Sequence, residues 1–133
     1  MIKTKYIEDE VFEASNEAGH TVTLDMRPGD DKEDMGPVEM VLSAISGCMA
    51  VEIVSMLQKK RKTIVDLNIE TVGTRNSDFP KYITKVNQKY ILTSPDAKIE
   101  DLKKVTELTH DKYCSVASSL KADIEFEYEI VRP

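Results

Sequence analysis

The sequence predicts an α+β fold in which largely antiparallel sheets surround one long central helix. Strand-like and helix-like segments follow in the order β-β-β-α-β-β-α-(α)-β, without the regular alternation of a parallel α/β fold. The segment that begins at Pro37 is apolar on most of its surface. One small sheet cannot cover such a helix, so we expect a second sheet or a second subunit to complete the cover.

Length and composition predict a single ordinary globular domain that spans residues 1–133. Of its 133 residues, 41% are hydrophobic and 32% are charged. The formal net charge of −6 argues against nucleic acid as the main partner, because nucleic-acid binding needs a positive surface. The first 15 residues show no apolar secretory core, so we expect a cytoplasmic protein with reduced thiols.

Three short strands open the chain. The third shows the clearest pattern, because Val22, Leu24 and Met26 alternate with polar residues as in a half-buried strand. A polar loop rich in helix and strand breakers follows at residues 27–36. The three predicted strands are residues 2–7, 10–15 and 20–26.

The central helix is predicted from Pro37 to the basic run Lys59–Lys62. Proline suits the first helical turn, and cations complement the dipole at a helix end, although the run also suits an anionic partner. The longest uncharged stretch, residues 40–51, falls short of the ~20 apolar residues of a membrane span. We therefore expect a helix buried in protein and no membrane partner.

The C-terminal half is predicted to form a hairpin, two helices and a last strand. Residues 64–74 and 82–93 alternate in polarity and form the hairpin. Ser94-Pro95-Asp96 starts the second helix, in which Ile99, Leu102, Val105 and Leu108 have helical spacing. Residues 114–120 form a short helix or turn, and residues 122–131 form the last strand.

Cys48 and Cys114 are the two cysteines, 66 positions apart. One interpretation is a pair of small buried hydrophobes, because free cysteine is among the most buried residue types. The other is a redox pair, which needs one thiol rich in thiolate and a second within reach. Lys112, two residues before Cys114, is a candidate activator of that thiol.

Helical geometry places the carboxylates near Cys48. At about 100° per residue, Glu39 points away from Cys48 of its own chain, whereas Glu52 at i+4 lies one turn away. A carboxylate alone raises the pKa of a thiol, so Glu52 is a poor activator without a bridging cation or proton. The alternative is that Glu52 pairs with a basic residue elsewhere.

The histidines and methionines admit two interpretations each. His110 ends the second helix four residues before Cys114, so it is either a partner of that thiol or a cation at a helix end. His20 begins a strand, and two histidines with two distant cysteines predict no metal site. Methionines on or near the central helix either fill the core or line a pocket for an acyl or aromatic substrate. They are Met35, Met40, Met49 and Met56.

Two motifs together resemble the OsmC-like family, the osmotically inducible and organic-hydroperoxide-resistance (Ohr) group. Gly36-Pro37-Val38-Glu39-Met40-Val41-Leu42 leads to Gly47-Cys48 and is followed by Ala50-Val51-Glu52-Ile53-Val54 and the basic helix end. Lys112-Tyr113-Cys114-Ser115-Val116 resembles the second cysteine motif of the family. The resemblance spans nearly the whole chain, and it is closest to the less characterised branch whose helix begins Pro-x-Glu.

The resemblance implies an intertwined homodimer in which two long helices lie between sheets from both subunits. It implies a thiol peroxidase that reduces organic hydroperoxides without a bound cofactor. Cys48 would match the peroxidatic cysteine, and Cys114 the resolving cysteine that condenses with its sulfenic acid. A small dithiol or a lipoyl-protein would serve as the external reductant.

The chain departs from the well-characterised peroxidases at two positions. Those enzymes carry an arginine in the N-terminal strands, whereas the first arginine here is Arg27, in the following loop. They place a glutamate directly after the helix-starting proline, whereas Val38 stands there and Glu39 follows. Arg27, Glu39 and Glu52 are therefore the candidate supporting residues. The departures also favour the alternative of a non-catalytic binding protein for an apolar small molecule. Dithiol–disulfide exchange without peroxide is a third, weaker alternative.

Overall fold

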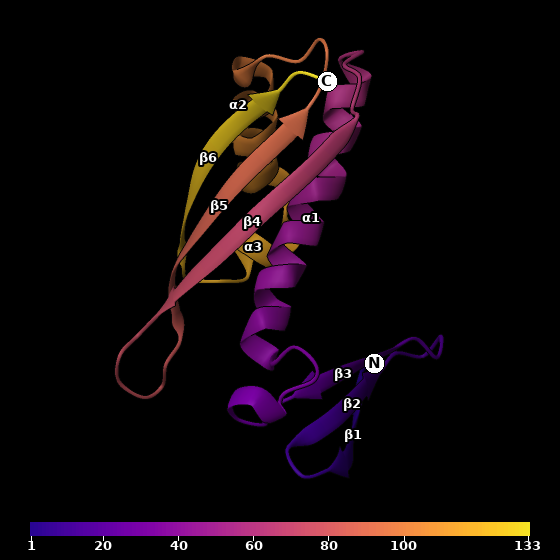
Figure 1. The fold of residues 1–133 in the computed structure, drawn as a ribbon, viewed down its shortest axis with the longest axis vertical. Helices are drawn as coiled ribbons and strands as arrows, with labels where there is room; N and C mark the ends of the chain where they lie inside the picture. Colours follow the sequence, from indigo (N-terminus) through magenta and orange to yellow (C-terminus); the bar gives the residue numbers. More distant parts are fainter. The chain divides into compact units, whose positions relative to one another are not determined.

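The computed structural model describes residues 1–133 and divides into two compact units, Met1–Val41 and Leu42–Pro133 (Figure 1). The long helix α1 (Pro37–Lys59) begins in the first unit and runs into the second. The expectation of a single domain over residues 1–133 stays a prediction.

The N-terminal unit contains a three-stranded antiparallel sheet in the order β1-β2-β3. Its strands, β1 (Lys3–Glu8), β2 (Val11–Ser15) and β3 (Thr21–Asp25), confirm the three that alternation predicts. All six residues of β1 are exposed. The polar loop after β3 includes a 3₁₀ turn, η1 (Gly29–Asp31).

Helix α1 begins at Pro37 as predicted, and its C-terminal end is closed by backbone hydrogen bonds. Arg61 adopts a left-handed conformation (φ 61°), and its N–H donates to the Gln58 carbonyl at 2.8 Å. The Lys62 N–H donates to the Leu57 carbonyl at 3.0 Å, which completes a Schellman motif. The Lys62 ammonium instead reaches the Asp96 carbonyl and Asp101, so this lysine does not cap the helix with its side chain.

One narrow stripe of α1 is buried within the chain. Its four buried residues, spaced four apart, are Ile45, Met49, Ile53 and Leu57. Only 22% of the most apolar 18-residue window is buried. By length and composition the helix is long enough to cross a membrane, so the length argument from residues 40–51 was wrong. A single such helix is weak evidence for a membrane span, because core helices of soluble proteins pass the same test.

The C-terminal unit is built on a sheet in the order β4-β5-β6. Strands β4 (Asp66–Arg75) and β5 (Ile83–Thr93) form the predicted antiparallel hairpin. Strand β6 (Asp123–Val131) pairs with β5 in parallel, because a helical crossover joins the two. A Cβ atom on Gly73 of β4 would lie 3.0 Å from the Leu42 side chain, so glycine permits the close approach of α1.

The crossover from β5 to β6 contains α2 (Ile99–Leu108), a π turn η2 (Thr109–Tyr113) and α3 (Ser115–Ser118), which lie behind the sheet in Figure 1. Helix α2 begins later than the sequence predicts, because Ser94 holds a turn through the Ala97 N–H at 3.0 Å. The Thr109 carbonyl accepts the Cys114 N–H at 2.8 Å and closes the π turn. An α+β fold with two small sheets and a long helix is thus confirmed.

Candidate functional site

The fold of the C-terminal unit brings Cys48 and Cys114 together. Cys48 lies near the middle of α1, and Cys114 follows the π turn as the N-cap of α3. Their side chains are within hydrogen-bonding reach of each other, although 66 positions separate them in the sequence. Both thiols are free, with Cys48 half-buried and Cys114 fully buried. Solvent therefore reaches the pair from the Cys48 side.

The surroundings of Cys114 favour the neutral thiol. Burial is the largest cause that raises the pKa of Cys114, and the Cys48 side chain raises it further. The Ala117 N–H, which donates to the Cys114 sulfur at 3.4 Å, acts in the opposite direction. The proposed activation by Lys112 finds no support, since Lys112 is exposed and does not contribute to the pKa of Cys114.

A series of hydrogen-bonded polar side chains, two buried and two half-buried, leads from the neighbourhood of Cys114 to α1. The Tyr90 hydroxyl donates to the Gln88 amide oxygen at 2.6 Å, and the Gln88 amide nitrogen donates to the Thr71 hydroxyl at 3.2 Å. The Thr71 hydroxyl lies 2.6 Å from the Ser46 hydroxyl, which donates to the Leu42 carbonyl at 3.1 Å. Because the Ser46 hydrogen goes to Leu42, Thr71 is the donor to Ser46.

The hydrogen bonds of this polar chain therefore all point from Tyr90 toward α1. Tyr90 is fully buried, and burial, Tyr128 and the nearby Cys114 raise the pKa of its hydroxyl. Its hydrogen is directed to Gln88, so the Tyr90 oxygen remains an acceptor. None of the four residues of this polar chain is among the candidates predicted from the sequence: Ser46, Thr71, Gln88 and Tyr90. The signal was available for two of them, because Gln88 and Tyr90 share a strand face with the apolar Val86 and Leu92.

Arg27 is held by a carboxylate within the N-terminal unit. Its guanidinium contacts fully buried Asp25 through two nitrogens, at 2.8 and 3.2 Å. This ion pair holds the pKa of Asp25 well below its usual range and that of Arg27 above its own. The Asp25 carboxylate also accepts the backbone N–H groups of Glu33 and Asp34. Arg27 thus orders the loop, and its support of a thiolate stays a prediction.

Glu39 takes part in capping α1. Its carboxylate accepts the Gly36 N–H at 3.3 Å and contacts the Lys32 ammonium at 3.3 Å. These two contacts, the Gly36 bond first, lower the pKa of Glu39. With Gly36 as N-cap, Glu39 occupies position N3, where a capping-box glutamate stands. The Pro-x-Glu spacing therefore has a local structural reason, and a role for Glu39 at a thiol remains a prediction.

The other sequence candidates have different surroundings. Glu52 is half-buried and forms no ion pair within 4.0 Å in the single chain, so its pairing with a basic residue elsewhere stays a prediction. His110 Nδ1 lies 3.2 Å from Asp111, and its ring packs edge-on against Phe126. No hydrogen bond joins His110 to Cys114.

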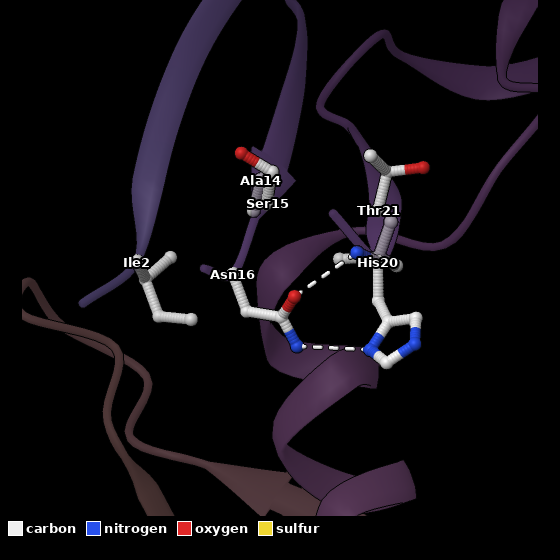
Figure 2. Close-up of a pocket in the computed structure, with 7 residues that line it drawn as sticks. Ile2, Ala14, Ser15, Asn16, His20 and Thr21 are labelled. Carbon is white, nitrogen blue, oxygen red and sulfur yellow. Dashed lines mark hydrogen bonds between the residues drawn. The ribbon is translucent and has the colours of Figure 1, made fainter. Parts of the chain in front are cut away.

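His20 lines a small pocket of about 210 Å³ within the N-terminal unit (Figure 2). The His20 Nδ1 atom lies 3.2 Å from the Asn16 amide nitrogen, and the His20 backbone N–H donates to the Asn16 side-chain oxygen at 3.0 Å. Figure 2 shows both contacts as dashed lines. His20 therefore closes the turn between β2 and β3.

The comparisons with known proteins agree with the fold. The family model described as OsmC-like protein matches residues 29–129 of this chain. The chain belongs to the OsmC-like family. Protein YhfA of Escherichia coli K12 is 34% identical over 131 residues, which are 97% of this chain and 96% of the relative.

Solved structures of other OsmC-like proteins have the same fold. The OsmC-like protein of Mycoplasma pneumoniae superposes with a TM-score of 0.79 at 21% identity, covering 99% of this chain and 95% of that one. The organic hydroperoxide resistance protein OhrB of Bacillus subtilis superposes with a TM-score of 0.64 at 12% identity, covering 98% of each chain. At these identities the likeness concerns the fold.

Proposed function

We propose that this OsmC-like protein is a thiol-dependent peroxidase that reduces organic hydroperoxides. The observation that carries the proposal is the meeting of Cys48 and Cys114, which are far apart in the sequence. The fold shared with a protein that is named for organic hydroperoxide resistance adds support. The partly accessible Cys48 is the residue that peroxide meets first.

The reaction proceeds in two balanced steps. The Cys48 sulfur attacks the O–O bond of the hydroperoxide, which yields the Cys48 sulfenic acid and one alcohol. The Cys114 sulfur then attacks the Cys48 sulfur, and the products are a disulfide and one water molecule. An external dithiol, either a small molecule or a lipoyl-protein, then reduces the protein disulfide to two thiols and is itself oxidised to a disulfide. The raised pKa of Cys114 suits a resolving thiol that stays protonated until Cys48 is oxidised.

The proposal includes a homodimer that works in the cytoplasm. One face of α1 is exposed although it carries apolar and small residues, among them Ala44, Gly47 and Val51. Small residues allow two helices to approach closely, so a second copy of α1 is the proposed cover. In such a dimer, Arg27 or Glu39 of the second copy is the proposed support for the Cys48 thiolate.

Peptide mapping after one equivalent of cumene hydroperoxide tests the cycle, with free thiols alkylated before digestion. We expect a Cys48–Cys114 disulfide in the wild-type protein. Cys114→Ser should consume one equivalent of peroxide and leave a sulfenic acid on Cys48 that dimedone traps. Cys48→Ser is the matched control and should consume none at a comparable rate. Two alkylatable thiols with peroxide left in solution would contradict the proposal.

A second candidate function is a non-catalytic binding protein for an apolar small molecule. The absence of a cationic side chain among the groups that act on Cys114 favours this alternative, as does the engagement of Arg27 by Asp25. Two thiols that stay unreactive toward peroxide in the peptide map would support it.

A further inference from the structure

A groove lies between the C-terminal part of α1 and α2, within the C-terminal unit. It has a volume of about 300 Å³, at the lower end of the range for small-molecule pockets. Six residues from the two helices line it: Met56, Lys59, Lys60, Lys104, Val105 and Leu108. The groove lies two helical turns along α1 from Cys48, and neither cysteine lines it.

The floor of the groove is apolar. Val105 is buried, and Leu108 of the same helix keeps 37% of its surface exposed. Met56 contributes a flexible thioether, and the Thr109 hydroxyl lies 3.9 Å from its sulfur. Such a floor accommodates an aliphatic chain without burying an unpaired polar group.

The rim of the groove is positively charged. Lys59, Lys60 and Lys104 form no ion pair within 4.0 Å, in a chain whose net charge is −6. No carboxylate lines the groove. The charge of Lys60 helps to lower the pKa of Asp101, but the Asp101 carboxylate forms its ion pair with the Lys62 ammonium, at 3.6 Å. Three unpaired ammonium groups around one apolar floor favour an anionic head group.

We propose that this groove binds an anionic amphiphile that is free in solution, with one apolar chain on the floor and a carboxylate among the three lysines. The volume fits a single medium-length chain better than a lipid with two chains. The site is separate from the thiol pair, so the proposal does not depend on peroxidase activity. It unites two alternatives that the sequence left open, the anionic partner of the basic run and the methionine-lined pocket.

Titration with sodium decanoate below its micelle concentration tests the proposal, with methyl-¹³C methionine as the NMR reporter. The Met56 methyl signal, assigned through Met56→Leu, should shift and saturate. The methyl signal of Met26, which is 54% exposed in the N-terminal unit, is the internal control and should stay in place. Decanol and acetate separate the contributions of charge and chain, and each should bind more weakly than decanoate.

A pair of neighbouring lysines gives a matched mutational control. Lys104 lines the groove, whereas Lys103 is exposed on the same helix and lies outside the lining. We expect Lys104→Gln to weaken decanoate binding about fivefold, as for the loss of one partly exposed charge pair. Lys103→Gln should leave the affinity within twofold of wild type, roughly the effect of a long-range screened charge.

Several results would overturn the proposal. They are an unmoved Met56 signal, equal affinity for decanol and decanoate, and equal losses for the Lys103 and Lys104 variants. A Met56 shift that appears only with vesicles containing an anionic lipid would assign the groove to a membrane surface instead. A protein dimer that leaves Met56 unresponsive to decanoate would assign the groove to contact between copies.

Discussion

The two units of this OsmC-like protein bury different kinds of group. The N-terminal unit buries a charge, Asp25, which holds the loop after β3 through Arg27 and backbone N–H groups. Its strand β1 is exposed along its whole length. The C-terminal unit buries an apolar stripe of α1 and the neutral pair Tyr90 and Gln88, which begins the hydrogen-bonded series that ends at half-buried Ser46.

This difference shows what each unit still lacks. A three-stranded sheet with so little buried apolar surface is marginal by itself, because burial supplies the main stabilising free energy. The C-terminal unit has its own core but leaves one face of α1 exposed. Both deficits are of the kind that a second copy covers, and three sets of variants test the comparison.

The largest effect is expected from a charge on the exposed face of α1. Val51 on α1 and Val72 on β4 are 63% and 64% exposed in the single chain, so they form a matched pair. We expect Val51→Glu to convert the protein from a dimer, with twice the chain mass of 15.0 kDa, to a monomer of 15.0 kDa. The reason is that an apolar interface does not accommodate an unpaired carboxylate. Val72→Glu should leave the mass unchanged. Sedimentation equilibrium measures both, and a monomeric wild-type protein would contradict the dimer.

An intermediate effect is expected from the polar chain of the C-terminal unit. Gln88→Leu leaves the buried Tyr90 hydroxyl without its acceptor, which should lower the free energy of unfolding by about 1–3 kcal/mol. Adding Tyr90→Phe removes the orphaned hydroxyl, so the double variant should lose less than the sum of the single variants. Urea denaturation of the four proteins completes the cycle. Strict additivity would show that the two side chains do not act together.

The smallest effect is expected from acid on the N-terminal unit. The pKa of Asp25 is lower in the folded protein than in the unfolded chain. Between the folded pKa and the ordinary pKa of ~3.9, the unfolded chain therefore binds more protons, and the stability decreases as the pH decreases. Above that ordinary value the contribution is complete. Asp25→Asn should therefore show a smaller loss between pH 5 and pH 3 than wild type, measured by urea denaturation.

Part of the acid dependence should persist in Asp25→Asn. Glu39, Asp96 and Asp101 also have lowered pKa values, and their contributions remain in the variant. An unchanged slope between pH 5 and pH 3 would mean that Asp25 does not control the acid response. Amide hydrogen exchange then locates the loss, which we expect first at β3 and the following loop.

The sequence by itself determined the secondary structure and its class. Alternation predicted β3 and the β4–β5 hairpin, and Pro37 marked the start of α1, because these signals depend on neighbours within a few residues. The glutamate at N3 was also a local signal, because its carboxylate accepts the Gly36 N–H at the start of α1.

Only the tertiary structure decided which distant groups meet. The parallel pairing of β6 with β5 depends on the path of the crossover, which no local pattern specifies. The contact between Cys48 and Cys114 joins α1 to the crossover. The hydrogen bonds that lead from the Tyr90 side chain to Ser46 join α1 to the sheet. The physical reason is that periodicity reports which face of an element is apolar, whereas packing selects the partner of that face.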